Sequence, residues 1–110
     1  MGVKIGYMIL SGLKDPNKAL CVKRITMKAK GRGYGKEAME AMMKWAFENT
    51  VTHRIWLDVK DFNRRAQHVY ESVGFRREGT LRESYLNGDV FESLIVMSIL
   101  RHEYKTEQLP

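Results

Sequence analysis

The 110-residue sequence predicts an α/β fold, a mixed sheet with two helices in the order β-β-α-β-α-β-β. Three observations predict it. Apolar residues recur at helical spacing from residue 35 to residue 49, and a strand-like run lies on each side of this stretch. A β-α-β unit of this kind has parallel strands and a right-handed crossover. Farther along, Asn87-Gly88 separates two more strand-like runs, which indicates an antiparallel hairpin.

The first half of the chain contains three predicted strands and one helix. Residues 3–10 form an apolar run, and the turn-forming residues 11–18 separate it from a second run at 19–28, so we expect these strands to pair. The helix over 35–49 is followed by a third strand at 54–59. The apolar face of this helix is expected in the core and consists of Ala38, Met39, Met42, Met43, Ala46 and Phe47.

A second, shorter helix is predicted over residues 64–73. Asn63 is a favourable N-cap residue because its side-chain oxygen can accept a hydrogen bond from a free backbone N–H of the first turn. Gly74 suits the position after the helix, where the backbone commonly takes a positive φ.

The last two predicted strands cover residues 77–86 and 90–100. The polar tail beyond Glu103 is expected to fray. We find no repeat, linker or low-complexity segment, and the length suits one domain, residues 1–110.

The composition is that of an ordinary soluble globular protein, with 44% hydrophobic and 29% charged residues. A net charge of +6 favours anionic partners, which include nucleic acids and coenzyme A. Cys21 is the only cysteine, so an internal disulfide is excluded, and we expect it to be a small buried hydrophobe. No signal peptide or membrane-spanning run is present, and we therefore expect a cytoplasmic protein.

A glycine-rich loop joins the second strand to the first helix. Gly31, Gly33 and Gly35 occupy alternate positions, where the missing side chains let a ligand approach the backbone N–H groups. The helix N-terminus behind the loop attracts negative charge. Six basic residues surround the loop without an acidic residue among them: Lys23, Arg24, Lys28, Lys30, Arg32 and Lys36. Together these features predict a site for a phosphate-bearing ligand.

Two familiar phosphate loops fit less well. The P-loop NTPase motif needs four residues between its first glycine and Gly-Lys-Ser/Thr, but only three separate Gly31 from Gly35, and Glu37 follows Lys36. The dinucleotide motif G-x-G-x-x-A fits residues 33–38, with Asp58 near the position of a ribose-binding acid. That fold, however, needs a buried strand directly before the loop and a second nucleotide-binding half, and this sequence shows neither.

The loop resembles the pyrophosphate-binding motif Gln/Arg-x-x-Gly-x-Gly/Ala of the GNAT superfamily of N-acetyltransferases. Lys30 stands at the Gln/Arg position, a departure that keeps the charge but loses the planar fork of arginine, and Gly33 and Gly35 are the two small residues. One helix and one strand later comes a second motif, Asn-x-x-Ala-x-x-x-Tyr-x-x-x-Gly-Phe. Its members are Asn63, Ala66, Tyr70, Gly74 and Phe75.

The second motif has a purely structural explanation, as a cap, a packing residue, a core aromatic residue and a terminating glycine. Its position after the glycine loop nevertheless resembles the second half of the GNAT coenzyme A site. Two further stretches resemble sequences of one branch of this superfamily, which contains ribosomal-protein N-terminal and polyamine acetyltransferases. They are Glu78-Gly79-x-Leu81-Arg82 and residues 97–100. The resemblance covers residues 3–104.

The resemblance implies a GNAT-like acyl-CoA N-acyltransferase fold that transfers the acetyl group of acetyl-CoA to a primary amine of a protein N-terminus or a polyamine. Tyr70 would be the catalytic acid that protonates the leaving thiolate. The implied coenzyme-binding residues are Ile25, Thr26, Met27, Lys30, Gly31, Arg32, Gly33, Tyr34, Gly35, Lys36, Asn63, Ala66 and Tyr70.

Two parts of the family pattern are missing. Such enzymes usually begin with a strand and two helices, and the resemblance implies that this sequence starts after them. The strand at 3–10 is then expected to be an exposed edge that a homodimer or another assembly covers. The strand at 19–28 carries no acidic residue, and Cys21 stands where many relatives have a glutamate as general base. Asp58 and Glu92 are the remaining candidates for the base.

Two alternatives to an active enzyme remain open. One is an inactive acyl-CoA-binding module, and the other is a small basic nucleic-acid-binding protein. The latter needs exposed aromatic residues for stacking, whereas Trp45, Phe47 and Trp56 are expected at core positions. A metal site is not expected, because the three histidines show no ligand spacing with Cys21.

Overall fold

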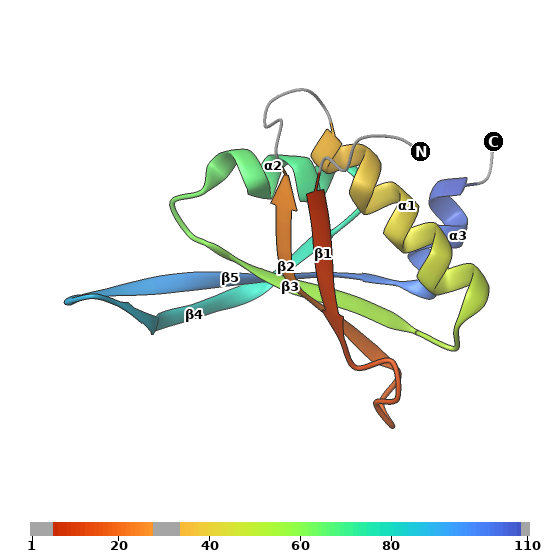
Figure 1. Ribbon diagram of the computed structural model, residues 1–110, viewed down its shortest axis with the longest axis horizontal. Helices are drawn as coiled ribbons and strands as arrows, with labels where there is room; N and C mark the ends of the chain where they lie inside the picture. Colours follow the sequence, from red (N-terminus) through yellow and green to blue (C-terminus); the bar gives the residue numbers. More distant parts are fainter. Residues whose placement is uncertain (1–5, 28–33, 109–110) are drawn as a thin grey trace.

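The computed structural model describes residues 6–27 and 34–108, which form five strands and three helices (Figure 1). The element order confirms the predicted β-β-α-β-α-β-β arrangement and adds a helix at the end. The elements are β1 (Gly6–Ser11), β2 (Ala19–Met27), α1 (Tyr34–Asn49), β3 (Arg54–Lys60), α2 (Arg64–Ser72), β4 (Arg76–Asn87), β5 (Val90–Leu100) and α3 (Arg101–Gln108).

The strands form one mixed sheet in the order β1-β2-β3-β5-β4. β1 pairs antiparallel with β2, β2 parallel with β3, and β5 antiparallel with both β3 and β4. The predicted first hairpin and the predicted β-α-β unit are both confirmed. β1 and β4 are the two edges of the described sheet.

The three helices lie on one face of this sheet. The connections β2-α1-β3 and β3-α2-β4 advance in the same direction across the sheet, and right-handed crossovers therefore place α1 and α2 on the same side. Side chains from β2, β3 and β5 form a single core cluster with α1 and with Tyr104 of α3. Within the described residues, no helix packs on the opposite face, which we call the outer face.

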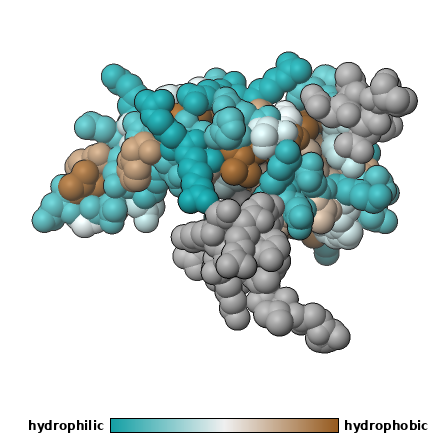
Figure 2. All heavy atoms as spheres, turned by 90° about the horizontal axis from the view of Figure 1, so that it is seen from above, coloured by the Kyte–Doolittle hydropathy of each residue, from teal (hydrophilic) through white to brown (hydrophobic). Residues whose placement is uncertain are grey.

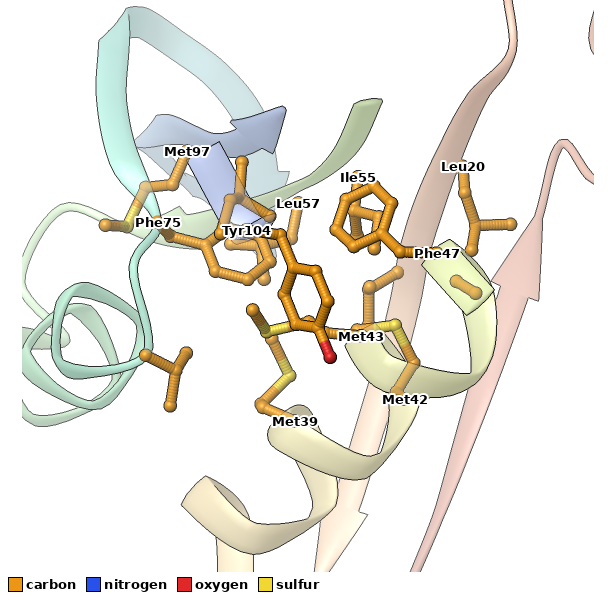
Figure 3. Close-up of a cluster of buried hydrophobic side chains, with 14 of the residues drawn as sticks. Leu20, Met39, Met42, Met43, Phe47, Ile55, Leu57, Phe75, Met97 and Tyr104 are labelled. Atoms are coloured by element: carbon orange, nitrogen blue, oxygen red, sulfur yellow. The ribbon is translucent and has the colours of Figure 1, made fainter. Parts of the chain in front are cut away.

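The core lies between α1 and the sheet (Figure 3). The predicted methionine face of α1 is confirmed, since Met39, Met42 and Met43 are buried with Phe47. β3 alternates between buried residues and more exposed ones, so each strand has one core side and one outer side. The strand residues that join the core are Leu20, Val22, Ile55, Leu57, Val59, Ile95, Met97 and Ile99.

The β4–β5 hairpin is confirmed, but its turn is centred one residue later than the Asn-Gly signal. Asn87 still pairs with Val90, so Gly88 and Asp89 make the turn, and Gly88 has a φ of +63°. A glycine with positive φ at the first central position is typical of a type II′ turn. The end of the hairpin exposes Leu86, Val90 and Phe91, and hydrophobic atoms gather at that end of the molecule in Figure 2.

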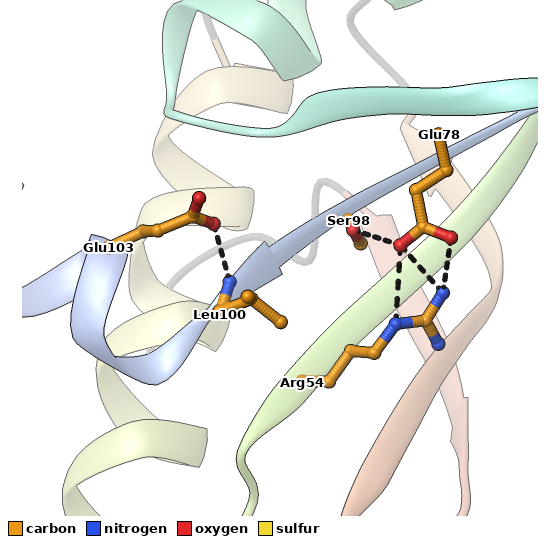
Figure 4. A network of polar contacts seen from close by, with 5 residues as sticks. All are labelled: Arg54, Glu78, Ser98, Leu100 and Glu103. Carbon is orange, nitrogen blue, oxygen red and sulfur yellow. Dashed lines mark hydrogen bonds and ion pairs between the residues drawn. The ribbon is translucent and has the colours of Figure 1, made fainter.

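The expectation of a frayed tail beyond Glu103 is wrong, because this segment forms α3. Tyr104 is only 7% exposed, and its ring lies 5.0 Å from that of Phe47. The Glu103 carboxylate accepts a hydrogen bond of 2.9 Å from the backbone N–H of Leu100 (Figure 4). Glu103 thus makes one half of a capping box, in which the third helical residue accepts from the backbone N–H at the cap position. Leu100 occupies the cap position but has no side-chain oxygen to make the other half. The one contact still fixes the first turn of α3.

Candidate active site

The parallel strands β2 and β3 separate after a short paired stretch. Ala19, Leu20 and Cys21 pair with Arg54, Ile55 and Trp56, and no pairing between the two strands follows in the described residues. β2 continues to Met27 with β1 on its other side, and β3 continues to Lys60 with β5 on its other side. The backbone groups of residues 22–27 and 57–60 on the facing edges are therefore free to bind a ligand.

The N-terminus of α1 follows the divergent end of β2 along the chain. The first four N–H groups of a helix have no partner within the helix, and they carry the positive end of the helix dipole. Gly35 is in this first turn, and no described atom lies within 4 Å of a Cβ built on it. The described part of the fold therefore does not require a glycine at this position. Of the predicted phosphate-binding residues, Lys30, Gly31, Arg32 and Gly33 lie outside the described residues.

The predicted cap of α2 is confirmed. Asn63 Oδ1 accepts a hydrogen bond of 3.2 Å from the backbone N–H of Ala66. Gly74 follows the helix with a φ of +107°, as expected of a terminating glycine. The Asn63 side chain is exposed, and no residue of the described chain accepts a hydrogen bond from its Nδ2. That amide group is thus available to a ligand.

Sequence reasoning missed Gln67, which positions α2 against the end of β3. Its Nε2 donates to the carbonyl oxygens of Lys60 (3.0 Å) and Asp61 (3.1 Å), and its Oε1 accepts from Arg77 (2.7 Å). The side chain is buried, and a buried amide needs partners of this kind. The feature of the sequence that could have pointed to Gln67 is its i, i+3 spacing from Tyr70 on the same helix.

Tyr70 packs on the edge of the core from α2, with its ring 6.2 Å from that of Phe75. The side chain is partly buried, and burial raises the pKa of its hydroxyl above the usual range. The hydroxyl makes no hydrogen bond to a described residue, and no fully buried polar side-chain atom in the described chain lacks a partner. The hydroxyl therefore reaches the surface as a protonated donor at neutral pH.

The candidate bases both lie on the outer face. Asp58 is an exposed residue of β3, and Glu92 of β5 forms an ion pair with Lys60. Cys21 also lies on this face, beside Trp56 on the paired part of the two strands. The expectation that Cys21 is buried was wrong in degree, because it is half-buried. Burial nevertheless raises the pKa of its thiol.

A polar network ties three strands together on the outer face (Figure 4). Arg54 of β3 binds both carboxylate oxygens of Glu78 at 2.8 Å, and the Ser98 hydroxyl of β5 donates to the same carboxylate. The Ser98 and Arg54 hydrogen bonds hold the pKa of Glu78 below its usual range. The network holds β3, β4 and β5 together at the level where β2 and β3 are still paired, next to the point where those two strands separate.

The aromatic residues do not all lie where the sequence predicted. Phe47 is buried as expected, but Trp45 is 44% exposed on α1. Trp56 is half-buried on the outer face, with the Arg54 guanidinium 5.7 Å from its ring. Trp45 on α1 and Trp56 on the outer face of β3 lie on opposite sides of the sheet, so these two residues do not form a continuous row for stacking.

No described helix is long and apolar enough to cross a membrane. No cluster of three or more histidine, cysteine, aspartate or glutamate residues that could hold a metal ion occurs among the described residues.

Two parallel strands that diverge, with α1 behind the glycine-rich loop and α2 beside them, are the arrangement that defines the class of acyl-coenzyme A N-acyltransferases. The family comparison agrees, since the model of the acetyltransferase (GNAT) family matches residues 2–75. The chain belongs to this family.

Two curated relatives have similar sequences. The spermidine N(1)-acetyltransferase of Escherichia coli K12 is 31% identical over 84 residues, which cover 76% of this chain and 45% of that protein. The enzyme of the same name from Vibrio cholerae is 30% identical over 74 residues, covering 67% of this chain and 43% of that protein. The chain therefore spans less than half the length of the curated relatives it matches.

A solved structure has a similar fold. The spermidine N-acetyltransferase from Vibrio cholerae, described in complex with CoA and spermine, gives a TM-score of 0.85 at 25% identity. The match covers 92% of this chain and 60% of that one. The predicted α/β fold of the GNAT type is thereby confirmed.

Proposed function

We propose that this chain is an N-acetyltransferase that moves the acetyl group of acetyl-CoA to a primary amine. The observation that carries the proposal is the divergence of β2 and β3 beside the N-terminus of α1, in a chain of the GNAT family. The free edges of residues 22–27 and 57–60 suit the amide groups of a pantetheine arm. The first turn of α1 suits the diphosphate.

The proposed mechanism uses backbone and side-chain donors that the fold positions. A neutral acceptor amine attacks the thioester carbonyl, and a backbone N–H near Met27 stabilises the oxyanion. The C–N bond forms, the C–S bond breaks, and Tyr70 donates its proton to the departing sulfur. Burial raises the pKa of the Tyr70 hydroxyl, which therefore carries its proton at neutral pH, as an ordinary tyrosine does. The proton released by the amine passes to solvent, directly or through Asp58.

We propose a polyamine as the acceptor, with a protein N-terminus as the second candidate. The curated relatives are named spermidine N(1)-acetyltransferases, and the related solved structure is described with spermine. The outer face of β3, from which an acceptor could reach the divergent strands, carries the exposed carboxylate of Asp58. A carboxylate there favours a cationic acceptor.

We further propose that the chain assembles as a homodimer that covers β1. β1 pairs with β2 on one side only, and its other edge has no partner strand in the described residues. A related solved structure, a spermidine N-acetyltransferase from Vibrio cholerae, is described as dodecameric. Unpaired strand edges favour pairing with another chain.

Calorimetric titration with acetyl-CoA tests the binding site directly. Gly35→Val should abolish binding, because the new side chain blocks the approach of the diphosphate to the helix N-terminus. Gly79→Val on the exposed strand β4 is the matched control, since a Cβ there also meets no described atom within 4 Å. Both variants should remain folded. Equal acetyl-CoA affinity in the two variants would overturn the assignment of the loop.

Turnover of spermidine by the Tyr70→Phe variant tests the chemistry. We expect acetyl-CoA affinity to stay unchanged and turnover to fall by roughly a hundredfold, the scale of lost general acid catalysis. An unchanged rate would remove Tyr70 from the mechanism. Binding of acetyl-CoA by the unmodified chain, without acetylation of any amine in a panel, would instead identify an inactive acyl-CoA-binding module.

A further inference from the structure

The side chain of Lys60 lies in a cluster of one carboxylate and two aromatic rings on the outer face. Its Nζ is 2.6 Å from Glu92 Oε1, 4.3 Å from the centre of the Tyr85 ring and 5.8 Å from that of the Phe62 ring. We call Glu92, Tyr85 and Phe62 the ammonium cluster. Such a combination of charge and ring faces is the chemistry that proteins use to recognise alkylammonium groups.

The cluster is built from two neighbouring strands and a loop. Glu92 on β5 pairs directly with Tyr85 on β4, and Phe62 lies between β3 and α2. The second carboxylate oxygen of Glu92 accepts a hydrogen bond of 3.3 Å from the Asn87 side chain. The Glu92 side chain is only 13% exposed, so its charge is fixed in place and partly shielded from water.

The cluster lies at the divergent end of β3. Lys60 is the last residue of that strand, and its carbonyl accepts a hydrogen bond of 3.0 Å from the backbone N–H of Asn63, the cap of α2. The free edge of β3 begins after Trp56, and four residues of strand span about 13 Å. An extended polyamine chain is of comparable length.

From this placement we infer that the ammonium cluster binds the non-reacting ammonium group of the polyamine acceptor, and that Lys60 holds this place until the acceptor displaces it. The inference rests on the proposed acetyltransferase function. Lys60 carries the same functional group as the acceptor, a primary ammonium on a flexible alkyl chain. The acceptor would then lie along the outer face, with its reacting amine at the divergent strands.

The test compares acceptors that do and do not carry a second ammonium group. Lys60→Met removes the competing ammonium, and we expect the KM for spermidine to fall by about tenfold. Glu92→Gln removes the charge of the cluster, and the KM for spermidine should rise by about tenfold. The KM for butylamine, which has no second ammonium, should change little in either variant. Lys44→Met and Glu40→Gln, at exposed positions of α1, are the matched controls.

Direct binding of spermidine to the Lys60→Met protein, measured by calorimetry without acetyl-CoA, separates the two proposals. Binding that disappears on adding Glu92→Gln supports the cluster even if no amine is acetylated, and only the proposed function would then fall. Equal changes in KM for spermidine and butylamine, in an active enzyme, would overturn the cluster and leave the function standing. A Lys60–Glu92 pair with a merely structural role predicts lower thermal stability and no change in acceptor preference.

Discussion

The side-chain amide of Asn63 uses only one of its two ends in hydrogen bonds within the described chain. Its oxygen caps α2 by accepting from the N–H of Ala66, and its nitrogen has no acceptor among the described residues. A local structural role and a ligand-binding role are therefore compatible in the same residue. The capping pattern in the sequence predicted the first role, and only the family resemblance suggested the second.

Substitutions of Asn63 should separate the two roles. Asn63→Ala removes the cap and should lower the free energy of unfolding by about 1 kcal/mol. Asn63→Asp keeps an oxygen acceptor and should retain this stability, but it replaces the donor nitrogen with a second acceptor. Chemical denaturation measures stability, and calorimetry measures acetyl-CoA affinity. If the aspartate variant binds acetyl-CoA as tightly as the unmodified chain, Asn63 has only its capping role.

At this scale the sequence predicted periodic positions well and isolated ones poorly. The methionines of α1 repeat at helical spacing, and the structure buries them. Trp45 and Cys21 carry no such pattern, so their expected burial rested on residue type alone. Trp45 is exposed, and Cys21 is half-buried. The partners of Gln67 come from β3 and β4, which no local pattern reveals.

Among the secondary-structure elements, α3 depends most on contacts distant in sequence. Arg101 at its start donates to the carbonyl oxygens of Phe47 (2.5 Å), Thr50 (2.9 Å) and Thr52 (2.9 Å). The guanidinium thus lies at the C-terminus of α1, where the helix dipole is negative. The sequence did not predict α3, because its residues are polar and its stabilising partners lie about fifty positions earlier.

Replacing Arg101 should therefore destabilise the chain. Arg101→Met leaves three partly buried carbonyl groups without their donor, and we expect the free energy of unfolding to fall by about 2–4 kcal/mol. Arg76→Met is the matched control. Arg76 is an exposed arginine whose ion pair in the described chain is with Glu103, and its loss should cost about 1 kcal/mol or less. Urea denaturation of both variants measures the difference. Equal losses would show that the three carbonyl contacts contribute little.

For the whole molecule, the sequence predicted the strand order along the chain and the parallel pairing of β2 with β3. It could not predict where this pairing stops, because the residues after Cys21 are as typical of a strand as those before it. The divergence of the two strands is a property of the folded sheet, and the candidate site depends on it. The residues of the site were named from a family pattern, whereas their arrangement came from the fold.

The proposed homodimer gives a prediction at the same scale. Ile9 is an exposed residue of the edge strand β1, and a charged side chain opposes strand pairing. We expect light scattering at micromolar concentration to give the mass of a dimer for the unmodified chain and of a monomer for Ile9→Lys. Val51→Lys, at an exposed position between α1 and β3, is the control and should remain dimeric. A monodisperse monomer for the unmodified chain contradicts the proposal.

β2 and β3 meet along a line that is paired over a short stretch, and we call this line the seam. It divides the sheet into a two-stranded ribbon (β1-β2) and a three-stranded ribbon (β3-β5-β4). Among the described residues, three residue pairs connect the ribbons, at the end remote from the helix N-terminus. An acyl carrier that hydrogen-bonds to both free edges would act as a sixth strand and close this seam. The substrate would then be a structural component of the sheet, and slower amide hydrogen exchange across the seam would accompany every binding event.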